Sequence, residues 1–253
     1  MRKRYGTCEP LDVLKVYLLT YSTMSLILKT VFKWMKKPRT RYARRTYSQE
    51  GEDMILQRVF SQRREGFYVD VGAHHPFRYS NTYVFYKKGW RGINIDGAPG
   101  SMAKFQKYRS RDINIEAVVS SASEPLEFYV FDDQAYNTSS NTQVEHALQQ
   151  GAKLIAQHRL ESLSLKKILD KHLPNSTQID FMSVDVEGFD LDVLKSNDWK
   201  RYRPTFLLVE CMNESLLLNE NDAICSYVAG QGYGFFGKTV NTVLFQLNDD
   251  KAL

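Results

Sequence analysis

The sequence predicts an α/β protein with a Rossmann-like, doubly wound and mostly parallel β-sheet that ends in an antiparallel hairpin. From Tyr47 onward, short β-rich runs alternate with helical ones, which is typical of successive strand–helix units. The final run, residues 233–247, holds two strands around a turn near 238–241, so one edge of the sheet is expected to be antiparallel. An apolar fraction of 43% and a charged fraction of 25% are those of a globular protein.

The expected helices are marked by their ends. The first begins after Ser48, where Glu52 and Asp53 form an acidic first turn ahead of an apolar face. The helix at 165–172 has Ser164 as its N-cap and ends before Pro174. Four further helices are expected at 81–88, 100–108, 191–195 and 223–230.

The expected strands lie between these helices, and Pro125 and Pro204 each stand directly before one of them. Before the C-terminal hairpin, the predicted strands are 67–71, 92–96, 112–119, 126–131, 179–186 and 205–210. The polar stretch 134–157 is hard to assign from its pattern. We interpret it as an excursion over the active face, partly helical after Thr142.

Length and cysteine content limit the class of protein. The 253 residues suffice for one large domain, or for one domain with an appendage, and we expect an arm over residues 1–46 and a domain over 47–253. Cys8, Cys211 and Cys225 are widely separated and form no C-x-x-C pair. This pattern argues against a disulfide framework or a structural zinc site, and it suits a cytoplasmic protein.

The charge of the chain is unevenly distributed. Residues 1–46 carry twelve Lys or Arg against two acidic residues, whereas the remainder has a net charge of −5. A basic patch across the fold, as expected of an enzyme that acts on nucleic acid, is therefore not evident, and we expect no nucleic-acid partner.

The arm has the pattern of a helix that lies in a membrane interface. Its uncharged run, Val16–Leu28, is shorter than the roughly 20 apolar residues that span a bilayer. Three lysines and a serine recur every seven residues and so share one side of the helix: Lys15, Ser22, Lys29 and Lys36. We expect peripheral contact with the cytoplasmic face of a membrane through residues 11–45. Packing on the domain, association with a partner subunit and a single-span anchor remain open.

Acidic residues end several of the predicted strands. Asp70 and Asp96 end the first two, Asp185 and Glu187 end the run "SVDVEG", and Glu210 ends "LLVE". Ligands of doubly wound sheets bind at the carboxyl ends of strands, and a buried carboxylate needs a partner. These acids therefore predict a binding site along one edge of the sheet.

The spacing of two of these acids indicates the type of cofactor. Gly72 lies two residues after Asp70, where the chain must turn tightly and let a ligand approach. Asp96 ends the next strand, where an acid can accept hydrogen bonds from both hydroxyls of a ribose. The single glycine of "DVGAHH" does not match the G-x-G-x-x-G turn that binds a pyrophosphate. A nucleoside cofactor without phosphates, S-adenosylmethionine, fits better.

Several long motifs resemble those of the FkbM-type methyltransferases. They are "YSQEGED", "GFYVDVGAHHP", "SNTYVFYKKGWRGINID", "PGSM", "IDFMSVDVEGFDLDVLKSNDW" and "YRPTFLLVE". The resemblance runs from Tyr47 to about Glu210 and leaves the arm outside. It implies a seven-stranded class I methyltransferase fold, S-adenosylmethionine as methyl donor and O-methylation of a sugar in a glycan, glycolipid or sugar-containing metabolite.

The resemblance also implies roles for individual residues. Asp70, Gly72 and Ala73 match the first cofactor motif, and Asp96 matches the ribose-binding acid. Three residues match the segment expected to close over the methionine end of the cofactor: Gln49, Glu52 and Asp53. Asn81 matches the start of the first helix after the cofactor motif. Asp185 and Glu187 match the fourth-strand motif that faces the substrate.

The chemistry of methyl transfer to a hydroxyl suggests catalytic candidates. Asp185 and Glu187 are two residues apart on a predicted strand, so their side chains are expected to share a face. With Glu210 they would form a general base or a site for a hard divalent cation. The alternatives are helix capping or cofactor binding for Asp185, and an ion pair for Glu210.

The adjacent histidines are weaker candidates for a metal site than the carboxylates. His74 and His75 are expected to point opposite ways, and no cysteine or other histidine lies at zinc-ligand spacing. A base or a substrate contact is the preferred interpretation, and His75 is the catalytic candidate.

Two other functions compete with methyl transfer. A nicotinamide-dependent oxidoreductase would use a similar sheet, although the single-glycine turn counts against it. A non-catalytic module that binds glycans or membranes would retain the fold, although the acids of the motif strands are present.

Overall fold

The computed structural model describes residues 24, 42–122, 124–211 and 222–248. The chain divides into two units, residues 1–45 and 46–253, and the second is described below. The amphipathic helix expected within 11–45 falls almost wholly outside the described residues. Within those residues, no helix is long and apolar enough to cross a membrane.

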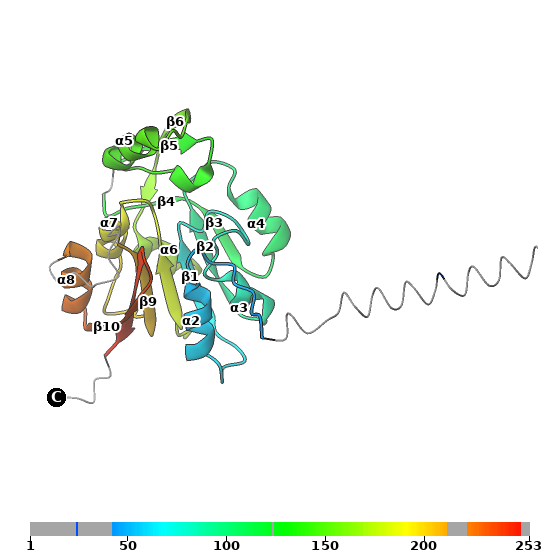
Figure 1. Cartoon of the computed structure of the whole chain (residues 1–253). Helices are drawn as coiled ribbons and strands as arrows, with labels where there is room; N and C mark the ends of the chain where they lie inside the picture. Colours follow the sequence, from blue (N-terminus) through cyan, green and yellow to red (C-terminus); the bar gives the residue numbers. More distant parts are fainter. Residues whose placement is uncertain (1–23, 25–41, 123, 212–221, 249–253) are drawn as a thin grey trace, which may run out of the picture. The chain divides into compact units, whose positions relative to one another are not determined.

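A seven-stranded sheet in the order β10–β11–β9–β8–β1–β2–β3 forms the centre of the domain (Figure 1). Its strands are β1 (Phe67–Val71), β2 (Arg91–Asp96), β3 (Ile113–Glu116), β8 (Phe181–Val184), β9 (Phe206–Glu210), β10 (Tyr233–Lys238) and β11 (Thr242–Leu247). All pairs are parallel except those of β11, which is antiparallel to both β9 and β10. The predicted class I methyltransferase topology, with its antiparallel hairpin, is confirmed.

The order of the strands reverses between β1 and β8. The chain steps outward from β1 to β2 and β3, and then returns to place β8 on the other side of β1. In the register of this central pair, Asp70 lies beside Ser183 and Val71 beside Val184. Because neighbouring loops leave such a pair in different directions, this is the point at which open α/β sheets bind ligands.

Helices cover both faces of the sheet. The larger apolar core includes buried side chains of three helices: α6 (Leu165–His172), α7 (Asp190–Lys195) and α8 (Ala223–Gly230). The second core is aromatic and includes side chains of α2 (Glu52–Val59) and α3 (Tyr83–Lys87). The Ser164 hydroxyl accepts a hydrogen bond from the Lys167 amide, which confirms the predicted N-cap of α6.

A cap lies over the carboxyl ends of the strands (Figure 1). It consists of β5 (Leu126–Phe131), η2 (Gln134–Tyr136), α5 (Asn141–Gln149) and β6 (Leu154–Leu160), with β5 and β6 antiparallel. The helix after Thr142 was expected, but β6 was not. Every residue of β6 is exposed or half-buried, so the strand lacks the apolar signal that marks a buried one.

Two predicted strands are shorter than expected. The run 112–119 breaks at Ala117, after which β4 (Val118–Val119) leaves the sheet and pairs with β7 (Ser162–Leu163). The run 179–186 becomes a strand only from Phe181 to Val184, so Asp185 and Glu187 lie in the following turn. Both departures occur at the carboxyl edge, where the Ala117 and Asp185 amides form the last backbone hydrogen bonds to the neighbouring strand, at 3.0 Å to Asp96 and Val71.

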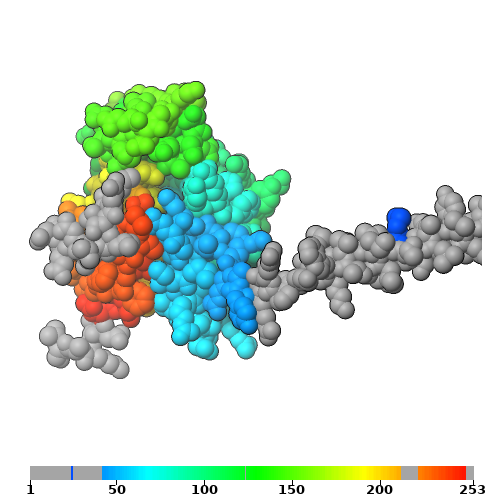
Figure 2. Space-filling view, viewed as in Figure 1, coloured from blue at the N-terminus to red at the C-terminus, as the bar shows by residue number. Residues whose placement is uncertain are grey.

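Helix α2 and the C-terminal hairpin, far apart in the sequence, lie side by side (Figure 2). The Asn241 amide donates to a carboxylate oxygen of Glu50 at 2.9 Å, and the Thr242 hydroxyl donates to Glu52 at 3.2 Å. These bonds attach the start of α2 to the hairpin beside the sheet edge that carries the acidic strand ends.

Gly92 provides a test of the packing beneath β2. A Cβ at this position would overlap the ring of Tyr68, which is fully buried and held by hydrogen bonds to its hydroxyl. We expect Gly92→Ala to lower the free energy of unfolding by about 1–3 kcal/mol through overpacking. Urea unfolding would measure the change.

Gly230→Ala, at the end of α8, is the control because nothing lies within 4 Å of its Cβ position. A Gly92→Ala protein as stable as wild type would contradict the tight contact with Tyr68.

Candidate functional site

A pocket open to solvent lies at the carboxyl ends of β1, β2 and β8, and it encloses about 830 Å³ including that open space. Its walls combine strand ends, the turn after β8 and the cap, and include Gln49, Gly72, His74, Tyr79, Asp96, Gly97, Val118, Phe128, Asn137, Thr138, Asp185 and Glu187. A smaller cavity of about 280 Å³ is also lined by Gln49, Tyr79 and Asp185, and its other lining residues include Glu52, Asn81 and Glu210.

The turn after β1 lies against the turn after β8. Gly72 has φ 81°, and a side chain there would overlap the carbonyl oxygen of Asp185. The Gly72 and Ala73 amides both donate to the Ile95 carbonyl, at 2.9 and 3.0 Å. Glycine is therefore required by both the left-handed backbone and the close approach. Ala73 itself is buried against Met102 and Phe105 and does not line the cavity.

Asp96 lines the cavity with its carboxylate fixed by backbone amides. One oxygen accepts from the His74 amide and the other from the Ala98 amide, each at 2.9 Å. Burial raises the pKa of Asp96, and these two hydrogen bonds oppose the shift. Each oxygen keeps a further lone pair, so the geometry suits a ligand that presents two adjacent hydroxyls.

Asp70 does not line either cavity. It is buried, and it accepts a hydrogen bond from the Thr82 hydroxyl at 2.7 Å. Burial raises its pKa to about 6, against the lowering effect of that bond and of Arg109. The predicted direct role of Asp70 at the cofactor is therefore not visible, and this acid lies behind the cavity wall.

The segment that leads into α2, together with the first turn of that helix, contributes two of its three predicted residues. Gln49 lines both cavities, and Glu52 lines the smaller one. Asp53 is fully buried instead, with hydrogen bonds from the Tyr47 amide and the hydroxyls of Thr46 and Ser48. Its carboxylate anchors the segment rather than facing a ligand. Asn81 lines the smaller cavity and donates to the Ser183 hydroxyl at 3.0 Å.

Three carboxyl groups converge where the two cavities meet. Oxygens of Asp185, Glu187 and Glu210 all lie within 4.8 Å of one another. The expectation that Asp185 and Glu187 share a strand face is wrong, because the strand ends at Val184. A turn in which Glu187 has φ 52° brings them together. Asp190, which the sequence analysis missed, supports this turn by accepting from the Val186 and Gly188 amides.

Burial and mutual repulsion make these groups hard to ionise. Burial raises the pKa of Glu187 to about 8, with further contributions from Asp185 and Asp190. Burial likewise raises the pKa of Asp185 to about 6 and that of Glu210 well above its usual range. One oxygen of Glu210 is buried without a hydrogen-bond partner. Carboxyl groups this close cannot all be charged, so the cluster holds protons near neutral pH.

Of the two adjacent histidines, His74 and not the expected His75 lines the cavity. His75, the catalytic candidate, does not line the cavity, and its Nδ1 accepts from the Phe77 and Arg78 amides. His74 lines the cavity, and its Nε2 is buried with no hydrogen-bond partner. Burial and the nearby Arg78 guanidinium lower the pKa of His74, which favours the neutral form of the ring. Nothing in the sequence around the two histidines indicates which ring faces the cavity, because the conformation of the turn decides it.

Backbone strain is concentrated around the cavities. Among the described residues, four that are not glycine have positive φ, and three of them line the larger cavity: His74, Tyr79 and Glu187. Such conformations cost about 1–3 kcal/mol each and persist only where the surroundings impose them. Strain at these three positions marks the cavity as a functional site.

Comparison with known proteins identifies a domain. The sequence model described as "Methyltransferase FkbM domain" matches residues 70–235. No functionally curated protein matches the chain.

Two solved structures resemble the fold weakly. A TehB-like SAM-dependent methyltransferase from Corynebacterium glutamicum is 8% identical, with a TM-score of 0.43 over 87% of this chain and 97% of that one. The 1,6-didemethyltoxoflavin-N1-methyltransferase of Burkholderia thailandensis, solved with 1,6-didemethyltoxoflavin and S-adenosylhomocysteine, is 11% identical. Its TM-score is 0.40 over 98% of this chain and 94% of that one.

The raised pKa of Glu187 predicts a pH-dependent stability. Between about pH 4.5 and pH 8 the folded protein keeps a proton that the unfolded chain releases, so stability falls as pH rises through this window. We expect Glu187→Gln to flatten the slope, which is at most about 1.4 kcal/mol per pH unit for one group. Urea unfolding at pH 5, 6, 7 and 8 would measure it.

Glu161→Gln is the control because Glu161 is exposed between β6 and β7. Parallel curves for wild type and Glu187→Gln would show that Glu187 ionises normally in the folded protein.

Proposed function

Because the chain belongs to the FkbM methyltransferase family, we propose that it transfers a methyl group from S-adenosylmethionine to a hydroxyl group of a saccharide. The observation that carries the proposal is the cluster of Asp185, Glu187 and Glu210 beside the larger cavity. A hydroxyl must lose a proton when it is methylated, and this cluster supplies carboxyl groups that exchange protons near neutral pH.

The larger cavity has the features that an S-adenosyl cofactor needs. Asp96 offers two oxygens to a ribose diol, and the apolar side chains of Ile95, Val118 and Phe128 suit an adenine ring. Gln49 and the Gly72 backbone line the part near Asp185. When bound, S-adenosylmethionine supplies the methyl group on a sulfonium that leaves readily. The protein must then align the acceptor hydroxyl and remove its proton.

Glu187 is the preferred general base. Its pKa of about 8 is close to the pH at which the enzyme would work, which favours efficient proton transfer. Asp185 would assist by holding the acceptor or by sharing the proton. His74 replaces His75 as the histidine placed to contact a ligand, because only the His74 ring faces the cavity.

The lining supports a saccharide as the acceptor. Tyr79 is 46% exposed and lies on the walls of both cavities, with its ring stacked at 19° against the ring of His74. The Arg78 guanidinium also lies over this ring, 4.5 Å from its centroid, so a sugar would pack on the part of the ring that stays exposed while its hydroxyls form hydrogen bonds. Asn81, Asn137 and Thr138 provide such partners. A glycan or a glycolipid precursor is the expected acceptor class.

A methyl-transfer assay with sugar-nucleotide and lipid-linked saccharide pools would test the proposal. Formation of S-adenosylhomocysteine should depend on the acceptor, and kcat should rise with pH as Glu187 ionises. We expect Glu187→Gln to lower kcat by about 10²- to 10⁴-fold, the usual contribution of a general base. The exposed Glu161→Gln should keep wild-type turnover.

Two outcomes would contradict the proposal. Tight binding of NAD without binding of S-adenosylmethionine would favour an oxidoreductase. Binding of S-adenosylmethionine without turnover on any pool would favour a non-catalytic module.

The same three carboxyl groups would also suit a hard divalent cation with oxygen ligands. We expect turnover to survive EDTA, because a general base at Glu187 needs no cation. Loss of turnover with EDTA and its recovery with Mg²⁺ would reassign Asp185, Glu187 and Glu210 as metal ligands. The assay above, run with and without chelator, distinguishes the two roles.

A further inference from the structure

Arg109 is the only buried Lys or Arg among the described residues. It follows α4 (Met102–Tyr108) and forms an ion pair with Asp112 at 2.9 Å, with neither side chain exposed. A fully buried ion pair is seldom more stabilising than apolar side chains of similar size, because both charges must be desolvated. Stability alone therefore does not explain why a charge lies here.

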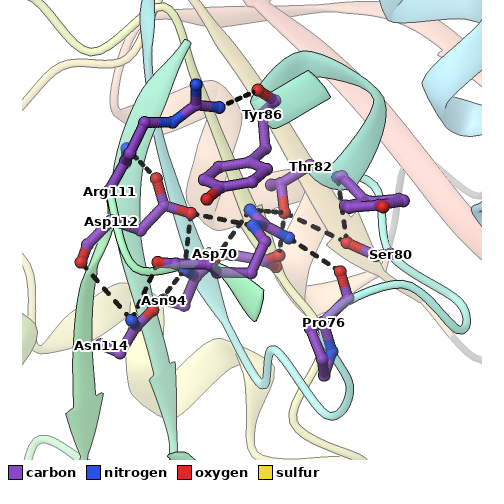
Figure 3. Close-up of polar contacts among 12 residues, drawn as sticks. Asp70, Pro76, Ser80, Thr82, Tyr86, Asn94, Arg111, Asp112 and Asn114 are labelled. Atoms are coloured by element: carbon purple, nitrogen blue, oxygen red, sulfur yellow. Dashed lines mark hydrogen bonds and ion pairs between the residues drawn. The ribbon is translucent and has the colours of Figure 1, made fainter. Parts of the chain in front are cut away.

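The guanidinium of Arg109 binds groups from several elements. Its acceptors are the Asp112 carboxylate, the Pro76 carbonyl at 3.1 Å, the Tyr68 hydroxyl at 2.7 Å, the Thr82 hydroxyl at 3.1 Å and the Asn94 amide oxygen at 3.4 Å. Figure 3 shows Pro76, Thr82 and Asn94 converging on one point between β1, β2 and the start of α3. Aromatic rings surround the same group, the closest being Tyr86 at 4.8 Å.

Because an arginine can only donate, it fixes the direction of the neighbouring hydrogen bonds. The Thr82 hydroxyl accepts from Arg109, which leaves its single proton for the Asp70 carboxylate at 2.7 Å. Asp70 lies behind the cavity wall at the end of β1, two residues before Gly72. Arg109 therefore orients Asp70 through one intermediate side chain.

A second contact reaches the cavity wall through the backbone. The Pro76 carbonyl, bound by Arg109, belongs to the turn that carries His74. In this turn His74 lines the cavity, and its amide binds the Asp96 carboxylate. One buried guanidinium thus holds the segment between Asp70 and Thr82 at its middle, through Pro76, and at its end, through Thr82. Arg109 lines neither cavity.

We propose that Arg109 is a positioning residue for S-adenosyl cofactor binding, which it supports by holding the Pro76 carbonyl and, through Thr82, the Asp70 carboxylate. The inference rests on the proposed cofactor site. It implies that loss of the Thr82 link weakens cofactor binding while the affinity for the acceptor is retained.

The test is the affinity of the full chain for S-adenosylhomocysteine, measured by calorimetry, for Thr82→Val and Thr82→Ser. Valine has the shape of threonine but cannot donate to Asp70, whereas serine keeps the hydroxyl. We expect the Kd to rise about tenfold in Thr82→Val, the size of effect typical of losing a supporting partner behind a binding site, and to stay within about twofold of wild type in Thr82→Ser. The KM for S-adenosylmethionine should rise and that for the acceptor should not.

Ser196→Ala is the matched control, because the Ser196 hydroxyl is also buried with two hydrogen bonds but lies after α7, away from the cavities. It should lower the melting temperature without changing the Kd. Arg109→Lys gives a second variant: lysine keeps the charge but cannot bind Pro76 and Thr82 with a fixed fork, so the Kd should rise.

Wild-type affinity in a folded Thr82→Val or Arg109→Lys protein would overturn the positioning role. Absence of binding by the wild type would instead refute the cofactor site.

Discussion

The need to accommodate negative charge at one edge of a sheet is the constraint on which the rest of this structure depends. Asp70, Asp96 and Asp185 end or follow the three adjacent strands β1, β2 and β8. Because parallel neighbours end at the same edge, these acids cannot move apart without breaking the sheet. A buried carboxylate without partners is costly, so the surrounding turns must supply donors or the acids must keep their protons.

The acids meet this constraint in two ways, and the difference separates binding from proton transfer. Asp96 accepts two backbone amides, which fix its geometry and oppose the rise of its pKa. Asp190 also accepts two backbone amides, yet burial still raises its pKa to about 8. The carboxyl groups of Glu187 and Glu210 are instead protonated by burial and repulsion. A fixed carboxylate suits recognition of a ligand, whereas a group with a raised pKa suits exchange of a proton. Both kinds lie along one edge because the fold places their strands together.

The turns at this edge are held in strained conformations by the rest of the domain. Gly72 packs against the Asp185 carbonyl, so the turns after β1 and β8 depend on each other. His74, Tyr79 and Glu187 keep left-handed backbones beside the cavity. The two apolar cores on either face of the sheet stabilise the strands to which these turns are attached. Arg109 adds a polar support behind the first turn, where an apolar residue would remove a hydrogen-bond donor from both the Thr82 hydroxyl and the Pro76 carbonyl.

The sequence by itself determined the sheet, its antiparallel hairpin and the acids at the strand ends, because alternating apolar runs and strand-terminal carboxylates are local signals. Only the tertiary structure decided that His74 rather than His75 faces the cavity, that Asp53 anchors the chain, and that β6 completes the cap. It also brought the expected cluster of Asp185, Glu187 and Glu210 together through a turn rather than along a strand face, and it placed Arg109 behind Asp70. The physical reason is that a side chain's direction in a turn, and its partner from a distant strand, are set by packing and backbone strain. The periodicity of a strand or helix predicts the direction of side chains only within that element, and it gives no such prediction for the turn that follows.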